Sequence, residues 1–381
     1  SGNFRPRNME QMPPMKSTME LFTPNAHSAW RIDTVPTAAE EAVRVADVAR
    51  RMHPSRTLLR QENVVRVNEG LRSKNFIATD VWDDGSEERV IYRADSIAPS
   101  SEAVEKRAEL IDYLADAGVS VPRSLPVDAG TERYVLTLDD IPWQRFHYVE
   151  GDHYRGRMDE LIDAGRGIGK LHAALKSYPY ADSFPATPYG TLETRLWQEA
   201  LDAVKGTPVA ASILEHRALT LDALPSVIRT VERLAQEGYG EEQLLHNDLH
   251  PQNLICNDGK LAAIIDFGNI AKGSVGLDIG MAFHRLVRQH LIDTNDRSPE
   301  TLGTAGIAFT HAYLSENPNF ANAMPYLPDY MRELILRKVS MVLTQFAAGK
   351  RPEAECMNEL TKFIGLLGEI DVIAEVCFTP S

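Results

Sequence analysis

Two short motifs contain the residues whose types and spacing could do chemistry. The first runs His246-Asn-Asp-Leu-His-Pro-Gln-Asn253, and the second, eighteen positions past Asp248, is Asp266-Phe-Gly268. A carboxylate such as Asp248 can accept the proton of a hydroxyl group. Asn253 and Asp266 offer the oxygen ligands that Mg²⁺ prefers. These are the groups that transfer of a phosphoryl group from ATP to a hydroxyl requires of a protein.

Each residue of the two motifs has a predicted role. We expect Asp248 to orient the acceptor hydroxyl and take its proton, and Asn253 and Asp266 to chelate Mg²⁺. His250 stands two residues after Asp248 and is a candidate donor to the γ-phosphate of ATP. His246 is predicted to be a packing residue that hydrogen-bonds the loop backbone. The apolar run at residues 261–265 predicts a strand that ends at the metal-binding turn.

The spacing from Asp248 to Asn253 is also that of the protein kinase catalytic loop. The segment after Gly268 reaches Asp278-Ile-Gly280 within about ten residues, which leaves no room for a peptide-docking segment. On HNDLHPQN, IIDFG and LDIG the chain resembles the aminoglycoside phosphotransferase-like family, which includes choline, ethanolamine, homoserine and hydroxylysine kinases. The resemblance covers most of residues 60–290. In that family Asp278 would hold the loop backbone or line the substrate pocket.

The resemblance implies an α+β, bilobal protein kinase-like fold with an N-terminal antiparallel sheet lobe and a mostly helical C-terminal lobe. We expect an irregular extension at 1–35, a nucleotide-binding lobe with a bracing helix at 36–150, and a helical lobe with catalytic loop and substrate pocket at 151–381. Within the nucleotide-binding lobe, apolar periodicity predicts helices at 38–52 and 100–117 and strands at 64–67, 76–82, 89–93, 132–138 and 143–149.

The polar turn between the first two predicted strands stands where a phosphate-covering loop belongs. It contains Gly70 but not the full Gly-x-Gly-x-x-Gly pattern of protein kinases. Ser73 and Asn75 resemble the looser Ser- and Asn-containing turns of small-molecule kinases, and they are candidate ligands of the phosphates of ATP. An ordinary hairpin is the alternative.

On the third strand, Arg93 stands where kinases place the lysine that binds the α- and β-phosphates. Its predicted partner is Glu109, with Glu105 one helical turn earlier as the alternative. The segment 145–151 resembles the adenine-binding hinge of the family. There we expect the backbone of His147 and Val149 to bind the adenine edge, although one sequence does not fix the register.

The glycines of Gly165-Arg-Gly-Ile-Gly-Lys170 suggest a nucleotide-binding loop, but Ala164 and Leu171 break the P-loop pattern. Apolar residues recur here at helical spacing, so we predict a tightly packed core helix. His172, on the same helix, is predicted to be structural rather than a ligand.

Composition bounds the class of protein. The 381 residues carry a net charge of −14, which argues against a nucleic-acid partner and is compatible with a cationic substrate. Three widely spaced cysteines fit a reducing compartment, and no apolar run reaches the length of a membrane span. The first residues have no apolar core typical of a secretory signal. We therefore expect a cytoplasmic protein with no membrane partner; its oligomeric state is not predicted.

The resulting hypothesis is an ATP- and Mg²⁺-dependent kinase that acts on the hydroxyl of a small molecule. The first expected acceptor is an amino alcohol such as homoserine, hydroxylysine or choline. Aminoglycosides and sugars are alternatives. Residues 155–195 and 283–330 are expected to set specificity. For a choline-like ligand, the candidate aromatic side chains are Trp197, Tyr313, Tyr326 and Tyr330, which fit helix packing equally well.

Two further interpretations depend on single features of the sequence. The unusual Arg93 and the missing glycines suggest a catalytically silent kinase fold that acts as a binding or regulatory module. His246, Asp248 and His250 alternate as the ligands of an iron site would on a strand, although Asp266-Phe-Gly is then unexplained.

Overall fold

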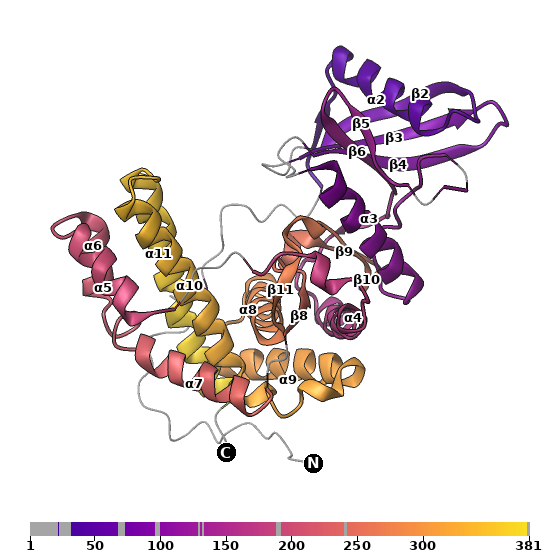
Figure 1. Ribbon diagram of the computed structural model, residues 1–381. Coiled ribbons are helices and arrows are strands. Elements are labelled where there is room, and N and C mark those ends of the chain that lie inside the picture. The colour runs from indigo at the N-terminus through magenta and orange to yellow at the C-terminus, as the bar shows by residue number, and fades with distance from the viewer. Residues whose placement is uncertain are drawn as a thin grey trace. The chain divides into compact units, whose positions relative to one another are not determined.

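The computed structural model describes residues 22, 32–67, 73–95, 100–128, 130–131, 133–187, 192–239 and 242–378. Contacts divide the chain into two units, each described by itself (Figure 1). The sheet unit comprises the described residues from 32 to Tyr154 together with Gln252–Gly268. The helical unit comprises Arg155–Pro251 and the described residues from Asn269 onward. An antiparallel sheet followed by a mostly helical remainder confirms the predicted α+β class.

The sheet unit is built on six antiparallel strands in the order β1-β2-β3-β4-β6-β5. Their bounds are β1 (Thr34–Pro36), β2 (Leu58–Val67), β3 (Lys74–Trp82), β4 (Glu87–Ala94), β5 (Leu136–Leu138) and β6 (Ile141–His147). The strands predicted at 64–67, 76–82 and 89–93 fall within β2, β3 and β4. β2 begins at Leu58, earlier than predicted, because a register shift between Glu62 and Val65, with Asn63 at φ +54°, lets a polar stretch continue the pairing with β3.

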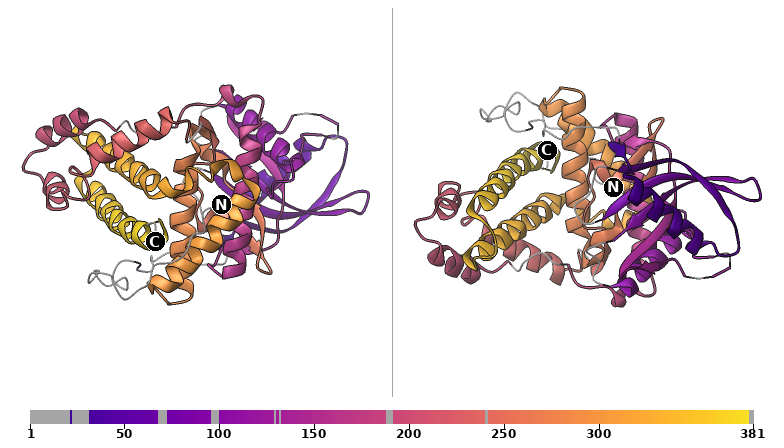
Figure 2. Two further views of the ribbon diagram at one scale, coloured as in Figure 1. Left: turned by 90° about the horizontal axis from the view of Figure 1, so that it is seen from below. Right: turned by 90° about the horizontal axis from the view of Figure 1, so that it is seen from above.

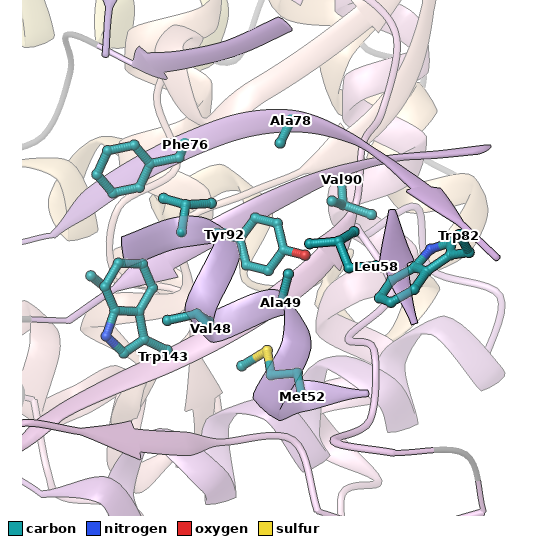
Figure 3. Close-up of a cluster of buried hydrophobic side chains, with 12 residues drawn as sticks. Val48, Ala49, Met52, Leu58, Phe76, Ala78, Trp82, Val90, Tyr92 and Trp143 are labelled. Atoms are coloured by element: carbon teal, nitrogen blue, oxygen red, sulfur yellow. The ribbon is translucent and has the colours of Figure 1, made fainter. Parts of the chain in front are cut away.

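Helix α2 (Ala39–Met52) packs its apolar face on this sheet, as Figure 3 shows. Val48, Ala49 and Met52 are fully buried against side chains that include Trp82, Tyr92 and Trp143 of the strands. Burial of a Val or Met side chain stabilises a fold by about 1.5–3 kcal/mol. The predicted helix at 38–52 is confirmed, and the face that was expected to brace the lobe is covered within the chain itself.

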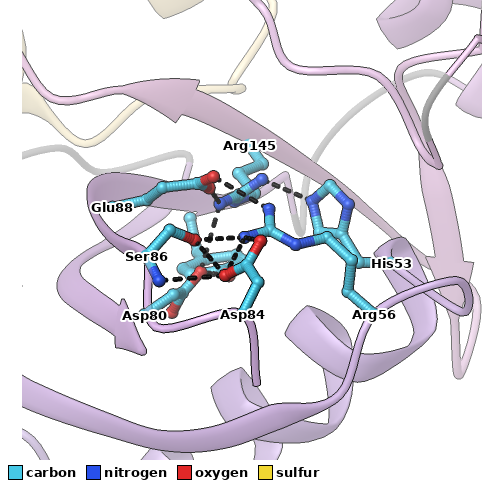
Figure 4. Close-up of polar contacts among 8 residues, drawn as sticks. His53, Arg56, Asp80, Asp84, Ser86, Glu88 and Arg145 are labelled. Atoms are coloured by element: carbon cyan, nitrogen blue, oxygen red, sulfur yellow. Dashed lines mark hydrogen bonds and ion pairs between the residues drawn. The ribbon is translucent and has the colours of Figure 1, made fainter. Parts of the chain in front are cut away.

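A buried arginine joins three strands of the sheet and the end of α2 (Figure 4). Arg145 of β6 is 2% exposed and pairs with Asp80 of β3, at 3.3 Å, and with Glu88 of β4. Its Nη1 also hydrogen-bonds Nε2 of His53. Burial and the charge of Arg145 lower the pKa of His53 to about 4, so the neutral imidazole accepts this bond. This network fixes the position of β6 in the sheet, and it thereby anchors the chain segment that follows the strand.

Helix α3 (Ser101–Asp116) confirms the helix predicted at 100–117, and the Ser100 side chain caps it by accepting the Ala103 N–H. A second, three-stranded sheet has the order β10-β9-β7, with β7 (Asp152–His153), β9 (Leu254–Asn257) and β10 (Lys260–Ile264). Gly151 permits the close approach of β7, because a Cβ there would lie 2.5 Å from the Cys256 carbonyl oxygen. This pairing joins Gln252–Gly268 to the sheet unit, whereas the sequence prediction grouped the segment with the helical lobe.

The helical unit contains eight α-helices among its described residues. They are α4 (Met158–Lys176), α5 (Thr194–Ala203), α6 (Pro208–Glu215), α7 (Leu224–Gln236), α8 (Val275–Asp293), α9 (Pro299–Glu316), α10 (Leu327–Ala347) and α11 (Glu353–Ile373). A two-stranded ribbon pairs β8 (Glu242–Leu245) with β11 (Ala271–Ser274). α8 is buried along nearly its whole length and contacts α4, α9 and α10, while α10 and α11 pack side by side (Figure 2).

The glycines at 165–170 lie inside α4, which confirms the prediction of a core helix. α4 packs against α9, and a Cβ at Gly169 would lie 2.7 Å from the Tyr313 carbonyl oxygen. The glycines therefore permit close helix packing and form no nucleotide-binding loop. Among the residues that the structure describes, no helix is long and apolar enough to span a membrane.

Candidate active site

Asp278 of α8 holds the backbone of the loop that follows β8. Its carboxylate accepts the N–H of His246 at 2.7 Å and the N–H of Asn247 at 2.9 Å. Asn247 has φ +62°, an uncommon conformation for a residue other than glycine. Two charge-assisted hydrogen bonds to a carboxylate that is only 1% exposed hold it there. Of the two roles predicted for Asp278, the structure shows the first, at the residues directly before Asp248.

His172 supports Asp278 from α4. Its Nε2 lies 3.3 Å from Asp278 Oδ2, and its Nδ1 lies 2.9 Å from the hydroxyl of Tyr313 on α9. The Tyr313 hydroxyl also accepts a bond from Asn317 at 3.0 Å. The contacts fit one tautomer, in which Nε2–H donates to the carboxylate and the tyrosine O–H donates to Nδ1. The ring is fully buried, as expected for a structural histidine.

Asp248 itself is partly accessible, with 28% of its side chain exposed. Asn269 Nδ2 donates to Asp248 Oδ2 at 3.3 Å, and His250 Nε2 lies 3.5 Å from Oδ1. Burial raises the pKa of Asp248, but the hydrogen bond from His250 and the nearby charges of His250, His246 and Lys338 outweigh it and lower the pKa overall. The carboxylate is therefore ionised at neutral pH and can accept a hydrogen bond from a hydroxyl group.

Asn269 is a contact residue of the site that the sequence analysis missed. Besides its bond to Asp248, its carbonyl oxygen accepts the Asn247 side-chain amide at 3.1 Å. The two asparagines thus link the segment after Gly268 to the loop at 246–248. The only sequence signal was the position of Asn269 three residues after Asp266, which lies in a short 3₁₀ turn rather than in a periodic element.

In the sheet unit, β10 ends at the predicted metal-binding turn, where Asp266 has φ +61°. Its Oδ1 lies 3.1 Å from Arg93 Nη1. Gly268 lies beside both groups, because a Cβ at this position would come within 3.1 Å of Asp266 Oδ1 and 3.5 Å of Arg93 Nη2. A side chain at Gly268 would therefore crowd the carboxylate and the guanidinium.

Arg93 pairs differently from the prediction. Its Nε donates at 2.9 Å to Asp95, which is 5% exposed and also accepts Arg107 of α3 at 2.7 Å. Glu109 lies on the exposed face of α3 and makes no ion pair within the described chain, and the alternative, Glu105, accepts the N–H groups of residues 134 and 135. The buried carboxylate of Asp95 requires cationic partners, and it takes both arginines.

Asn253 and Asp266 flank the paired strands β9 and β10. The Asn253 carbonyl accepts the N–H of Ile265 at 2.9 Å, which ties together the chain segments of the two predicted metal ligands. One amide oxygen and one carboxylate fit Mg²⁺, which takes few protein ligands and completes its shell with water and phosphate oxygens. Nowhere in the described ranges do three or more His, Cys, Asp or Glu side chains form a metal-binding group, so the iron triad of His246, Asp248 and His250 is not formed.

The other candidate nucleotide ligands lie on or beside the strands of the sheet unit. Asn75 of β3 is directly opposite Arg93 of β4 in the strand register, and Ser73 precedes β3. His147 is the exposed last residue of β6, and Val149 follows it. Gly70 lies outside the described residues. The nucleotide contacts of these residues stay predictions.

The sequence pattern that defines the phosphotransferase enzyme family, APH, matches residues 63–318 of the chain. The chain belongs to this family. No curated protein sequence gives a match. Membership identifies a small-molecule kinase and favours an enzyme over a catalytically silent module.

Solved structures share the fold of this phosphotransferase. An amicoumacin kinase in complex with AMP-PNP, Ca²⁺ and Ami is 17% identical with a TM-score of 0.58, over 87% of this chain and 94% of that chain. A spectinomycin phosphotransferase in complex with ADP and spectinomycin is 12% identical with a TM-score of 0.57, over 90% and 100%. A microcompartment-associated aminopropanol kinase is 17% identical with a TM-score of 0.52, over 88% and 100%. At these identities the likeness establishes the fold alone.

Proposed function

We propose that this phosphotransferase moves the γ-phosphoryl group of ATP to a hydroxyl of a small molecule of the amino-alcohol class. The observation that supports it is the state of Asp248: an ionised, partly accessible carboxylate, oriented by Asn269 on a loop whose backbone Asp278 clamps. A general base that takes the proton of a substrate hydroxyl must be accessible to the substrate and held in a fixed orientation.

In the proposed step, the acceptor oxygen forms a bond to the γ-phosphorus and its proton passes to Asp248. The bond from the γ-phosphorus to the oxygen it shares with the β-phosphate breaks, and ADP leaves with that electron pair. The products are ADP, a phosphate monoester and one proton, which Asp248 releases to solvent. Asn253 and Asp266 would hold Mg²⁺, which when bound neutralises charge on the phosphates.

Arg93 is suited to bind phosphate in place of lysine. Its Nε and Nη1 donate to Asp95 and Asp266, whereas Nη2 bonds no protein atom within the described chain. The guanidinium is therefore fixed in direction and keeps donors for a phosphate oxygen. We propose that Ser73 and Asn75 contribute further phosphate contacts, and that His250 donates to the γ-phosphate.

The aromatic candidates argue against a choline-like acceptor. Trp197, Tyr313 and Tyr330 are each at most 1% exposed, so their rings pack in the core. Tyr326 stacks on Tyr239, and Arg233 covers its ring at 5.1 Å from the centroid. A quaternary ammonium group needs open aromatic faces, and these four residues do not offer them.

The test is ATP-dependent ADP formation with Mg²⁺ across amino alcohols, hydroxy amino acids, aminoglycosides and sugars. We expect Asp248→Asn to lower kcat by about 10²- to 10⁴-fold, the usual contribution of a general base, with nucleotide binding retained. Asp293→Asn, at the exposed end of α8, is the control and should leave kcat unchanged. Full activity in Asp248→Asn would refute the proposed role.

A further inference from the structure

Two arginines from different elements of the sheet unit share one buried carboxylate. Asp95, which directly follows β4, is 5% exposed, and its Oδ1 accepts a hydrogen bond from Nε of Arg93 at 2.9 Å. Its Oδ2 accepts one from Nη2 of Arg107 on α3 at 2.7 Å. The carboxylate therefore ties the end of β4 to this helix. Arg107 has no role among those predicted from the sequence.

The two guanidinium groups also meet beside Asp266, the predicted metal ligand. A Cβ built on Gly268 would lie 3.5 Å from Arg93 Nη2 and 3.8 Å from Arg107 Nη1. The same point lies 3.1 Å from Asp266 Oδ1, and all of these residues belong to the sheet unit. Donor atoms from two elements thus converge on one place next to Asp266, and a side chain at residue 268 would take up the space beside them.

Neither guanidinium uses all of its donors on the protein. Arg107 gives Nη2 to Asp95, and its Nη1 and Nε bond no atom within the described part of the chain. Arg93 gives Nε to Asp95 and Nη1 to Asp266, which leaves Nη2. A guanidinium has five N–H donors and no acceptor. Both side chains are therefore fixed in direction by Asp95 and still hold donors for the oxygens of a ligand on the side of Gly268.

The charges of this cluster favour an anionic ligand. A carboxylate as buried as that of Asp95 needs a cationic partner, and one arginine meets that need. The second guanidinium is not required for this purpose, and two cations at short range repel each other. Asp266, whose side chain is 43% exposed, pairs with Arg93 at 3.1 Å. When Asp266 binds Mg²⁺ as predicted, the two arginines keep only Asp95 as a shared counter-charge within the cluster.

We propose that Arg107 is a second phosphate-binding residue, which acts together with Arg93 on the diphosphate part of the bound nucleotide. This inference rests on the proposed function. Kinases pair a strand lysine, which binds phosphate, with a glutamate on the following helix. Here the helix supplies a cation instead, and the anion is Asp95 at the end of the strand. Guanidinium groups bind phosphate oxygens through more than one N–H, so two of them can hold the phosphate chain from two sides. The position beside Asp266 favours the nucleotide as the ligand, because Mg²⁺ bridges oxygens of the phosphate chain.

The experiment measures binding of ADP and of adenosine by calorimetry, with Mg²⁺ and without it, in the absence of any acceptor. Arg107→Met should raise the Kd for ADP by about 10- to 100-fold, since a hydrogen bond to a charged group contributes that much to binding. The Kd for adenosine, which has no phosphate, should not change. Asp95 keeps Arg93 as its partner in this variant, so the chain should fold, and thermal unfolding checks this.

Lys106→Met is the matched control, because it removes one positive charge from the same helix at a residue that pairs with Glu102 at 2.8 Å. It should leave the Kd for ADP unchanged. Arg107→Lys keeps the charge but not the planar fork, and it should have an intermediate Kd. A further comparison separates direct contact from an effect through Arg93. In an Arg93→Lys background, which keeps a cation on β4, Arg107→Met should still raise the Kd for ADP by about 10-fold or more.

The outcomes separate this inference from the proposed function, because binding of ADP requires neither an acceptor nor transfer. An unchanged Kd for ADP in Arg107→Met would refute the contact while the kinase stands. No effect of Arg107→Met in the Arg93→Lys background would show that Arg107 acts only by orienting Arg93, and would also overturn it. Equal weakening of ADP and adenosine, or a wild-type chain that binds no ADP, would do the same. If no acceptor were phosphorylated but Arg107→Met weakened ADP alone, the proposed transfer would fail and the phosphate contact would stand.

Discussion

Asp278→Asn tests whether the loop clamp positions Asp248, the proposed catalytic base. The substitution keeps the size of the side chain but removes its charge and replaces one acceptor oxygen with an amide donor. In the native chain both carboxylate oxygens accept loop N–H groups, at 2.7 and 2.9 Å, and His172 lies 3.3 Å away. The asparagine can therefore satisfy only one of the two backbone donors, and the other faces an NH₂ group.

The expected loss of stability follows from the number of hydrogen bonds that the substitution removes. A hydrogen bond to a charged group contributes about 1.5–3 kcal/mol, and a buried donor without a partner costs about 1–3 kcal/mol, so we expect a loss of about 2–4 kcal/mol in stability. At about 2–4 °C per kcal/mol for a domain of this size, Tm should fall by roughly 5–15 °C. Release of Asn247 from its left-handed conformation should also displace Asp248, and a shift of about 1 Å costs on the order of 10²-fold in kcat.

Thermal unfolding and steady-state ADP formation measure the two effects separately. Asp293→Asn, on the same helix but exposed, should change neither Tm nor kcat. KM for ATP should change little, since Arg93 and its partners lie in the sheet unit. If Asp278→Asn kept the wild-type Tm and kcat, the two backbone bonds would not be what holds the loop, and the reasoning would be refuted.

Two further predictions concern packing and pH. Gly169→Ala should destabilise the chain by about 1–3 kcal/mol through overpacking, because the new Cβ would lie 2.7 Å from the Tyr313 carbonyl oxygen and 2.9 Å from Glu316 Cβ; Gly365→Ala, with no atom within 4 Å, is the control in thermal melts. Folding lowers the pKa of His53 from 6.5 to about 4, so its stability contribution is present above pH 6.5 and is lost as pH falls toward 4. That loss is about 3 kcal/mol, and His53→Gln should flatten the pH dependence of Tm between these limits.

Local patterns predicted most of the sheet unit. Alternating apolar residues gave β3 and β4, and the helical stripe of α2 was visible because each pattern lies in one continuous segment. The small sheet was harder to predict, since β7 and β9 are about a hundred residues apart in sequence and pair only through the close approach at Gly151. A long-range pairing of this kind has no periodic sequence signal.

The partner of Arg93 was predicted wrongly for a different reason. Family resemblance indicated Glu109 on the helix, whereas the observed partner, Asp95, stands two residues after Arg93 in the sequence. Side chains at that spacing share a face along an extended segment, so the sequence did contain this signal. What it did not contain is the burial of Asp95, and burial decides that this carboxylate must be paired.

Phosphoryl-transfer chemistry and acceptor recognition differ in how the sequence encodes them. The proposed base and the predicted metal ligands stand on two short turns, because the geometry of such groups tolerates little variation, and short turns can be recognised as sequence motifs. The ranges expected to set acceptor specificity, residues 155–195 and 283–330, instead span several separate helices of the helical unit. No sequence spacing rule links residues on separate helices, so the acceptor pocket has no short motif by which the sequence could reveal its chemistry.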